Sequence, residues 1–313
     1  MESKGLVMEI AVQTMTGYRE TLELAKWAES EGVTALAVAD HYLTGIRPDD
    51  PVVDQLTVLA GIARETSDIL LVSLVSPITF RHPAVMLKIA AALDEMSEGR
   101  FSLGVGAGWM EEEHRVFGLP FPGTRTRFEM LTEALAYLQA ARDPAAPGFS
   151  GTHFSLEPGT TPRPLPTGVR IVVGGSGSVR TPRLAGRYAD EYNLFPTERQ
   201  DEASRIEAFR EEAIRAGRDP GRVLLSTAFP GVAGATRHEF EEMLGKMAAA
   251  RGVEETRMAA RLGQLGIPHG TPDDVSAGLQ RLAGLGIGRV YLQMAFQPLE
   301  TTRRVVRVFR EAA

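Results

Sequence analysis

The chain has 313 residues, of which 43% are hydrophobic and 24% charged, and its formal net charge is −6. These values are typical of a globular protein with a large core, and the absence of a basic run argues against nucleic acid as the main partner. The sequence has no cysteine, which excludes disulfides, thiolate catalysis and cysteine-ligated metal sites. It shows neither a signal-peptide pattern nor an apolar run of membrane-spanning length, so the cytoplasm is the expected location.

Apolar segments alternate with amphipathic segments along the chain. Eight buried strands are expected at residues 6–12, 35–39, 69–75, 101–105, 169–173, 191–195, 223–228 and 289–294. Helices are expected at residues 18–31, 54–65, 83–96, 125–141, 179–188, 202–216, 237–250, 274–285 and 301–313.

Two stretches interrupt this alternation. Residues 143–166 are rich in proline and glycine and contain GFSGTHFSLEP, which predicts a hairpin inside a long loop. Residues 251–266 show no strand pattern and are expected to form a second insertion. The following Thr271-Pro272 pair predicts a helix start, with a capping threonine and a proline at the first helical position.

This order of elements predicts the fold class. Strands that alternate with helices favour a parallel sheet, and eight repeats favour a closed (β/α)8 TIM barrel over an open doubly wound sheet. No flexible linker divides the chain, so we expect one domain over residues 1–313. Function in such a barrel lies at the C-terminal ends of the strands. That rule singles out Gln13, Met15, Asp40, His41, Ser73–Ser76, Ala107–Trp109, Gly174–Ser178, Asn193–Pro196, Phe229, Gln293 and Met294.

Three of these strand ends suggest chemistry from their residues alone. The segment GGSGSVRT, at residues 174–181, leaves a strand and opens a helix, which predicts a phosphate site on free backbone amides; the alternative is a plain turn. Glycines at 104, 106 and 108 suit a flat or anionic ligand or a tight turn, but they do not form the dinucleotide motif. His41 could donate, accept or orient a proton, or could only hydrogen-bond a neighbouring loop.

Several longer motifs occur together and in order: FRHP at residues 80–83, LDEMSEGRFSLGVGAGW at 93–109 and FGLPF at 117–121. Through them the chain resembles the bacterial luciferase-like monooxygenase superfamily, and within it the branch that uses the deazaflavin coenzyme F420. The segment RLAGRYADEYN, which ends at Asn193, resembles the same branch. The resemblance extends over nearly the whole chain and implies the same barrel, often as a homodimer.

The resemblance also implies roles for individual residues. His41 would be the acid–base group near the hydride-carrying carbon of the ring, and Asp40 would contact the polar edge of the ring. A cis peptide bond between Ser73 and Leu74 would form a bulge under the ring. The coenzyme-binding residues implied are Asp40, Ser73, Leu74, Ala107, Gly108, Gly174, Gly175, Ser176, Gly177 and Asn193.

One position departs from the pattern of the F420 branch. Its sugar-phosphate dehydrogenases carry a glutamate acid where this chain has Trp109. A tryptophan cannot protonate a substrate, so glucose-6-phosphate oxidation is not expected, and Trp109 would instead wall the ring or the substrate pocket. The acids at residues 111–113 are expected only to complement a helix dipole. The remaining histidines are scattered and predict no metal site.

The expected activity is hydride transfer between C5 of coenzyme F420 and an unidentified small organic substrate. One alternative is an FMN-dependent monooxygenase that uses the same pocket with oxygen. Another is a non-catalytic paralogue that only binds a coenzyme. Residues 143–166 and 251–266 would cover the pocket and set substrate choice. A small-molecule substrate and a second copy of the chain are the expected partners, without nucleic acid or membrane.

Overall fold

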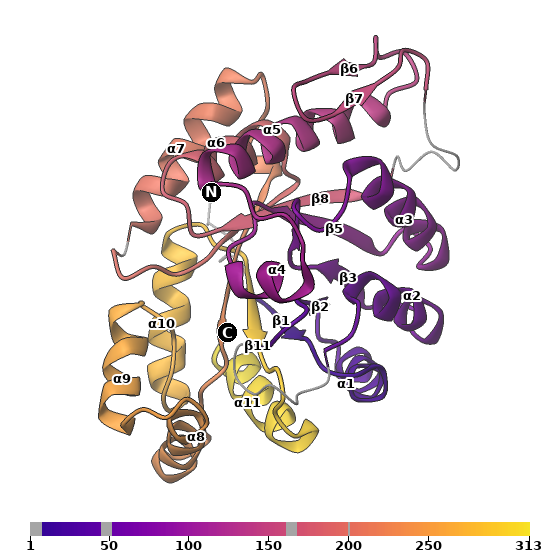
Figure 1. Cartoon of the computed structure of the whole chain (residues 1–313). Helices are drawn as coiled ribbons and strands as arrows, with labels where there is room; N and C mark the ends of the chain where they lie inside the picture. Colours follow the sequence, from indigo (N-terminus) through magenta and orange to yellow (C-terminus); the bar gives the residue numbers. More distant parts are fainter. Residues whose placement is uncertain (1–7, 45–51, 161–167, 200) are drawn as a thin grey trace, which may run out of the picture.

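A computed structural model describes residues 8–44, 52–160, 168–199 and 201–313. Its centre is a barrel of eight parallel strands surrounded by helices (Figure 1). β1 pairs with β11 and β3 pairs with β5, which closes the ring and confirms the predicted (β/α)8 barrel. The strands are β1 (Glu9–Thr14), β2 (Ala35–Val38), β3 (Leu70–Ser73), β5 (Phe101–Gly106), β8 (Arg170–Gly175), β9 (Glu191–Leu194), β10 (Leu224–Pro230) and β11 (Arg289–Gln293).

Most helices begin and end within a few residues of the predicted positions, because local capping bonds define their starts. Asp54 accepts the backbone N–H of Thr57 at 2.8 Å where α2 begins. Asp274 accepts the backbone N–H of Thr271 at 3.0 Å beside Pro272. The helices that surround the barrel are α1 (Tyr18–Ser30), α2 (Gln55–Glu65), α3 (Pro83–Met96), α5 (Thr124–Ala141), α6 (Arg180–Tyr188), α7 (Glu202–Arg215), α8 (Arg237–Ala250), α10 (Pro272–Gly284) and α11 (Leu299–Ala312).

Buried side chains form two layers. Between the strands and the helices lies a large aliphatic and aromatic core. Inside the barrel lies a smaller group, in which alanines leave room for the ring of Tyr291: Ala11, Ala35, Ala37, Val72, Leu74, Val172, Ala228 and Tyr291. Near the N-terminal end of the barrel, Arg289 donates to Glu191 at 2.9 Å and lies 2.6 Å from Glu9. This ion-pair network therefore lies at the end opposite the strand ends that carry the candidate site.

The two insertions and one connection contain their own elements. The first insertion forms the predicted hairpin from β6 (Phe149–Ser150) and β7 (Ser155–Leu156), while its residues 161–166 lie outside the described chain. The second insertion contains helix α9 (Glu255–Gln264). A short helix, α4 (Glu111–Phe117), follows β5 and was not predicted as a separate element. None of the helices in the described ranges combines the length and apolar character needed to cross a membrane.

The structure of the third strand differs from two of the expectations. It does not run continuously over residues 69–75, because β3 ends at Ser73 and the chain resumes pairing with β5 only at β4 (Ser76–Pro77). The cis peptide bond joins Leu74 to Val75, so the predicted cis bond between Ser73 and Leu74 was placed one residue too early. The backbone N–H of Leu74 still donates to Val38 O at 3.0 Å, so the backbone leaves its neighbouring strand only after Leu74.

Candidate functional site

The predicted site residues gather along one arc of the barrel mouth. Asp40 and His41 follow β2, and Ala107 follows β5, while Gly174 and Asn193 lie near the C-terminal ends of β8 and β9. The strands β2, β3, β5, β8 and β9 are successive neighbours in the barrel. Because parallel strands end at the same edge of a barrel, residues far apart in sequence meet there.

His41 is held by a buried carboxylate. Its Nδ1 lies 3.2 Å and 3.3 Å from the two carboxylate oxygens of Glu113, whose side chain is only 1% exposed. The same carboxylate accepts the backbone N–H of Tyr42 at 2.9 Å. Because a carboxylate accepts hydrogen bonds, we assign the proton to Nδ1 of His41, which leaves the lone pair on Nε2. Nε2 has no partner among the residues that the structure describes.

Helix α4 places Glu113 at this position, and His114 anchors the helix. The Nδ1 of His114 donates to Met110 O at 2.8 Å, so its Nε2 accepts from the Thr79 hydroxyl at 2.7 Å. Figure 1 shows α4 in front of the strands. The sequence argument missed Glu113, because it treated three consecutive acids as helix-dipole partners. Phe117, one turn after Glu113, contacts the ring of Tyr42 but is itself 53% exposed, so the sequence held no clear signal that this helix has an inward face.

Trp109 is the largest exposed apolar side chain beside this pair. It is 70% exposed, and its ring centroid lies 5.6 Å from that of His41 in an edge-on arrangement. The backbone turns at Gly108, whose φ is +79° and whose added Cβ would lie 3.0 Å from the Thr79 hydroxyl. An exposed tryptophan at the barrel mouth offers a surface that a planar or apolar ligand can cover. Its role as a wall of the ring or substrate pocket remains a prediction.

Asp40 lies in a salt bridge rather than free at the mouth. It is 3% exposed, and its Oδ2 accepts from Arg81 Nη1 at 2.5 Å. Arg81 also pairs with Asp54, so the ion pairs tie the chain after β2 to the start of α2. Burial raises the pKa of Asp40, while the guanidinium of Arg81 acts in the opposite direction. The predicted contact between Asp40 and the polar edge of the ring therefore competes with Arg81 and remains a prediction.

The bulge after β3 presents Val75, which the sequence argument did not identify. Val75 is partly exposed, whereas Ser73 and Leu74 are buried. A Cβ added at Gly104, Gly106 or Gly174 would lie 2.9 Å from a Val75 methyl group. These glycines are therefore needed so that the bulge can pack against the ends of β5 and β8. The Ser73 hydroxyl accepts the Gly104 backbone N–H at 2.7 Å, so it braces the bulge.

A buried arginine holds the glycine loop after β8 from the loop's buried side. Arg205 is 0% exposed, and it donates to Gly175 O at 2.9 Å and to Phe195 O at 2.8 Å. Ser176 is exposed and Gly177 is partly exposed on the open side of this loop. These two hydrogen bonds from Arg205 fix the backbone of the loop, so the exposed side of the loop is preorganised for a ligand.

Two observations test whether this loop could hold an anionic coenzyme tail. Helix α6 begins at Arg180 without a side-chain cap, so its first backbone amides remain available, although Pro182 supplies none. In β9, the amide nitrogen of Asn193 donates to Ser226 at 2.9 Å, while its buried Oδ1 has no hydrogen-bond partner in the described chain. The open amides at the start of α6 fit negative charge on a ligand, whereas the unpartnered Oδ1 of Asn193 is an acceptor and fits a hydrogen-bond donor.

Comparison with known proteins assigns the family. The sequence profile described as luciferase-like monooxygenase matches residues 6–289. The chain belongs to this family. The predicted resemblance is therefore confirmed, and luciferase-like proteins similar to this chain include both F420-dependent enzymes and monooxygenases.

Individual luciferase-like relatives match over part of their length. The chain is 30% identical over 206 residues to an F420-dependent glucose-6-phosphate dehydrogenase of Kineococcus radiotolerans, covering 64% of this chain and 60% of that protein. It is 34% identical over 148 residues to the pyrimidine monooxygenase RutA of Pseudomonas savastanoi, covering 45% and 39%. These matches thus span less than two thirds of either relative. An F420-dependent secondary alcohol dehydrogenase, solved with an F420–acetone adduct, shares the fold at a TM-score of 0.80, 19% identity and 98% coverage of both chains.

Proposed function

We propose that this protein is an oxidoreductase that binds coenzyme F420 in the barrel mouth and transfers a hydride between its C5 and a small organic substrate. The observation that carries the proposal is the His41–Glu113 pair, which leaves Nε2 of His41 without a described partner beside the exposed Trp109. The similarity to F420-dependent enzymes supports the choice of coenzyme.

The residues of the mouth have distinct tasks in this proposal. The bulge at Val75 and the turn at Gly108 shape the surface under the ring, and the loop at residues 174–177 holds the phosphate of the tail. When bound, the deazaflavin supplies the carbon that carries the hydride. The chain supplies orientation, exclusion of water by Trp109, and one group that can hold a proton at a defined atom.

That atom is Nε2 of His41. With Nδ1 committed to Glu113, the ring cannot rotate freely, and only Nε2 can exchange a proton with a ligand. His41 can therefore accept a proton from an alcohol-like or amine-like donor, or return one, as the hydride moves.

A second candidate is an FMN-dependent monooxygenase that uses the same mouth. The 34% identity to RutA, which is a pyrimidine monooxygenase, favours it. The position of Trp109 argues separately against glucose-6-phosphate as substrate, because the indole cannot serve as the acid that the sugar-phosphate dehydrogenases place there.

Titration of the purified protein with each coenzyme tests the proposal. We expect saturable quenching of F420 fluorescence and no comparable response to FMN. His41→Ala should keep F420 binding and lose turnover, whereas Glu207→Gln, an exposed position on α7, should keep both. Binding of FMN without binding of F420 would reject the proposal in favour of the monooxygenase.

A further inference from the structure

Arg205 is a buried cation that links the ends of two neighbouring strands. It belongs to α7, and its side chain is fully buried behind the loop that follows β8. Its Nη2 donates to Gly175 O at 2.9 Å, and its Nη1 donates to Phe195 O at 2.8 Å. One side chain therefore fixes the backbone where β8 and β9 end.

The hydrogen bond to Gly175 O also sets the direction of the next backbone amide. The carbonyl and the N–H of a trans peptide bond lie in one plane and point in opposite directions. The bond between Gly175 and Ser176 is trans, since the cis bond in the described chain joins Leu74 to Val75. Because Gly175 O points toward Arg205, the N–H of Ser176 points away from it. Ser176 is exposed and its N–H makes no hydrogen bond within the described chain, so this donor is open to a ligand.

The second carbonyl that Arg205 binds provides no such donor. Phe195 is followed by Pro196, which has no N–H. Arg205 thus turns an amide outward at the end of β8 and not at the end of β9. Gly175 permits this geometry, because its φ of +153° is rarely adopted by residues with a side chain.

The positive charge of Arg205 is only partly compensated. Among the described residues, Asp201 is the one carboxylate within 4.0 Å, and its Oδ1 lies 3.6 Å from Nη1, too far for a hydrogen bond. That oxygen instead accepts from the Thr197 hydroxyl at 3.0 Å. The first turn of α6 contains no acidic residue. A buried guanidinium is screened less than an exposed one, so it favours an anion on the open side of the loop.

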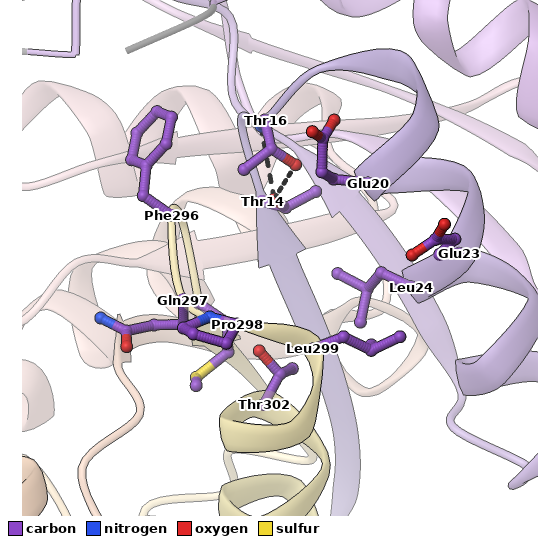
Figure 2. Close-up of a pocket in the computed structure, with 11 residues that line it drawn as sticks. Thr14, Thr16, Glu20, Glu23, Leu24, Phe296, Gln297, Pro298, Leu299 and Thr302 are labelled. Atoms are coloured by element: carbon purple, nitrogen blue, oxygen red, sulfur yellow. Dashed lines mark hydrogen bonds between the residues drawn. The ribbon is translucent and has the colours of Figure 1, made fainter.

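The cavity shown in Figure 2 does not suit an anion. It has a volume of about 390 Å³ and lies between the strands β1 and β11 and the helices α1 and α11, outside the barrel mouth. The carboxylates of Glu20 and Glu23 line it, and its described lining contains neither lysine nor arginine. These carboxylates would repel a phosphate, which leaves the loop beside Arg205 as the better anion site.

We propose that Arg205 is a positioning residue that makes the loop at residues 174–177 select a coenzyme with a phosphate tail over the same ring without one. It does not touch the phosphate. It directs the N–H of Ser176 toward the ligand and supplies positive charge behind the loop. This role rests on the part of the proposed function that places the phosphate of the coenzyme at this loop, and it holds for either F420 or FMN.

Fluorescence titration with two matched pairs of ligands tests the proposal. The pairs are F420 with its deazaflavin that lacks the phosphate tail, and FMN with riboflavin. Arg205→Met should weaken binding of F420 roughly tenfold, the order expected for one charge-assisted hydrogen bond, and should leave the phosphate-free deazaflavin unchanged. Arg205→Lys keeps the charge but cannot bridge both carbonyls, so it should recover part of the phosphate preference.

Asp201→Asn tests the charge while leaving Arg205 in place. It removes the neighbouring negative charge, so F420 should bind about threefold more tightly while the phosphate-free ring is unaffected. Arg218→Met is the matched control. Arg218 donates to Gly186 O at 2.9 Å and Ala189 O at 2.5 Å at the other end of α6, so its loss should lower stability without changing the phosphate preference.

The role of Arg205 is overturned if Arg205→Met keeps the full phosphate preference, if it weakens both members of a pair equally, or if Arg218→Met has the same effect. The second pair separates this role from the proposed function. If FMN binds and F420 does not, the proposed function fails, whereas a selective loss of FMN over riboflavin in Arg205→Met still supports the positioning role. A wild-type protein that binds none of the four ligands, or binds both pairs without a phosphate preference, overturns the positioning role.

Discussion

Glu113→Gln removes the charge that holds His41 while keeping the size of the side chain. The carboxylate accepts from two donors, His41 Nδ1 and the backbone N–H of Tyr42. An amide has only one acceptor oxygen. If that oxygen stays with Tyr42, the amide NH2 group faces Nδ1, which must then accept, and the ring proton moves to Nε2. If the amide is reversed, the NH2 group faces the N–H of Tyr42 instead.

The first arrangement pairs both contacts and changes only the tautomer of His41, whereas the reversed arrangement leaves the N–H of Tyr42 without an acceptor and has a cost of predictable size. Because Glu113 is 1% exposed, a donor left without an acceptor there should lower the free energy of unfolding by about 1–3 kcal/mol. Turnover should fall further, by about 10²- to 10⁴-fold, which is the usual contribution of positioned acid–base catalysis. The coenzyme titration curve should change little, since Glu113 is buried behind His41.

Long-range ¹⁵N–¹H NMR of histidine-labelled protein gives the most specific assay. We expect the His41 ring to carry its proton on Nδ1 in the wild type and to lose that preference in Glu113→Gln. Glu112→Gln is a matched control, because its side chain is 68% exposed and its nearest charged partner, Arg115, lies 3.9 Å away. An unchanged tautomer together with unchanged turnover in Glu113→Gln would refute the reasoning.

Three further predictions concern the scaffold around the site. Arg289→Met should lower the free energy of unfolding by roughly 3–5 kcal/mol in a denaturant titration, because it leaves the buried Glu191 unpaired; a loss below 1 kcal/mol would contradict this. Gly104→Ala should destabilise the protein by about 1–3 kcal/mol or more, because the new Cβ would lie 1.9 Å from Ser73 O, whereas Gly263→Ala meets nothing within 4 Å and should not. Glu133 accepts three backbone N–H groups, from Thr152, His153 and Phe154; burial would raise its pKa, but these bonds together lower it below the ordinary 4.5. Its stabilisation of the β6–β7 hairpin should therefore be full above pH 4.5 and lost as pH falls through the lowered pKa; amide protection factors of residues 152–154 that do not fall with acidification would contradict this.

The barrel could be predicted from the sequence because its signals are local. Apolar runs with β-branched residues mark buried strands, and capping residues such as Asp54 and Pro272 mark helix starts. The same strand order then places Asp40, Gly174 and the other strand-end residues on one mouth. Single-domain organisation, a homodimer and a cytoplasmic location remain predictions.

The missed features depend on contacts between distant residues. The carboxylate of Glu113 meets His41 across 72 positions of sequence, and only the folding of α4 over the mouth brings them together. The cis bond falls after Leu74, and no residue pattern encodes its position. The position of Val75 depends on its packing against glycines of β5 and β8, so no local sequence pattern predicts it. Helix α4 has seven residues, too few to show a clear periodic pattern.

A crystal structure of the protein soaked with coenzyme F420 tests the central claim most directly. We predict that the deazaflavin ring lies against Val75 and Trp109 with its reactive edge toward Nε2 of His41, and that the phosphate contacts the backbone at residues 174–177. A phosphate anchored at another loop, or a ring that does not approach His41, would contradict the account.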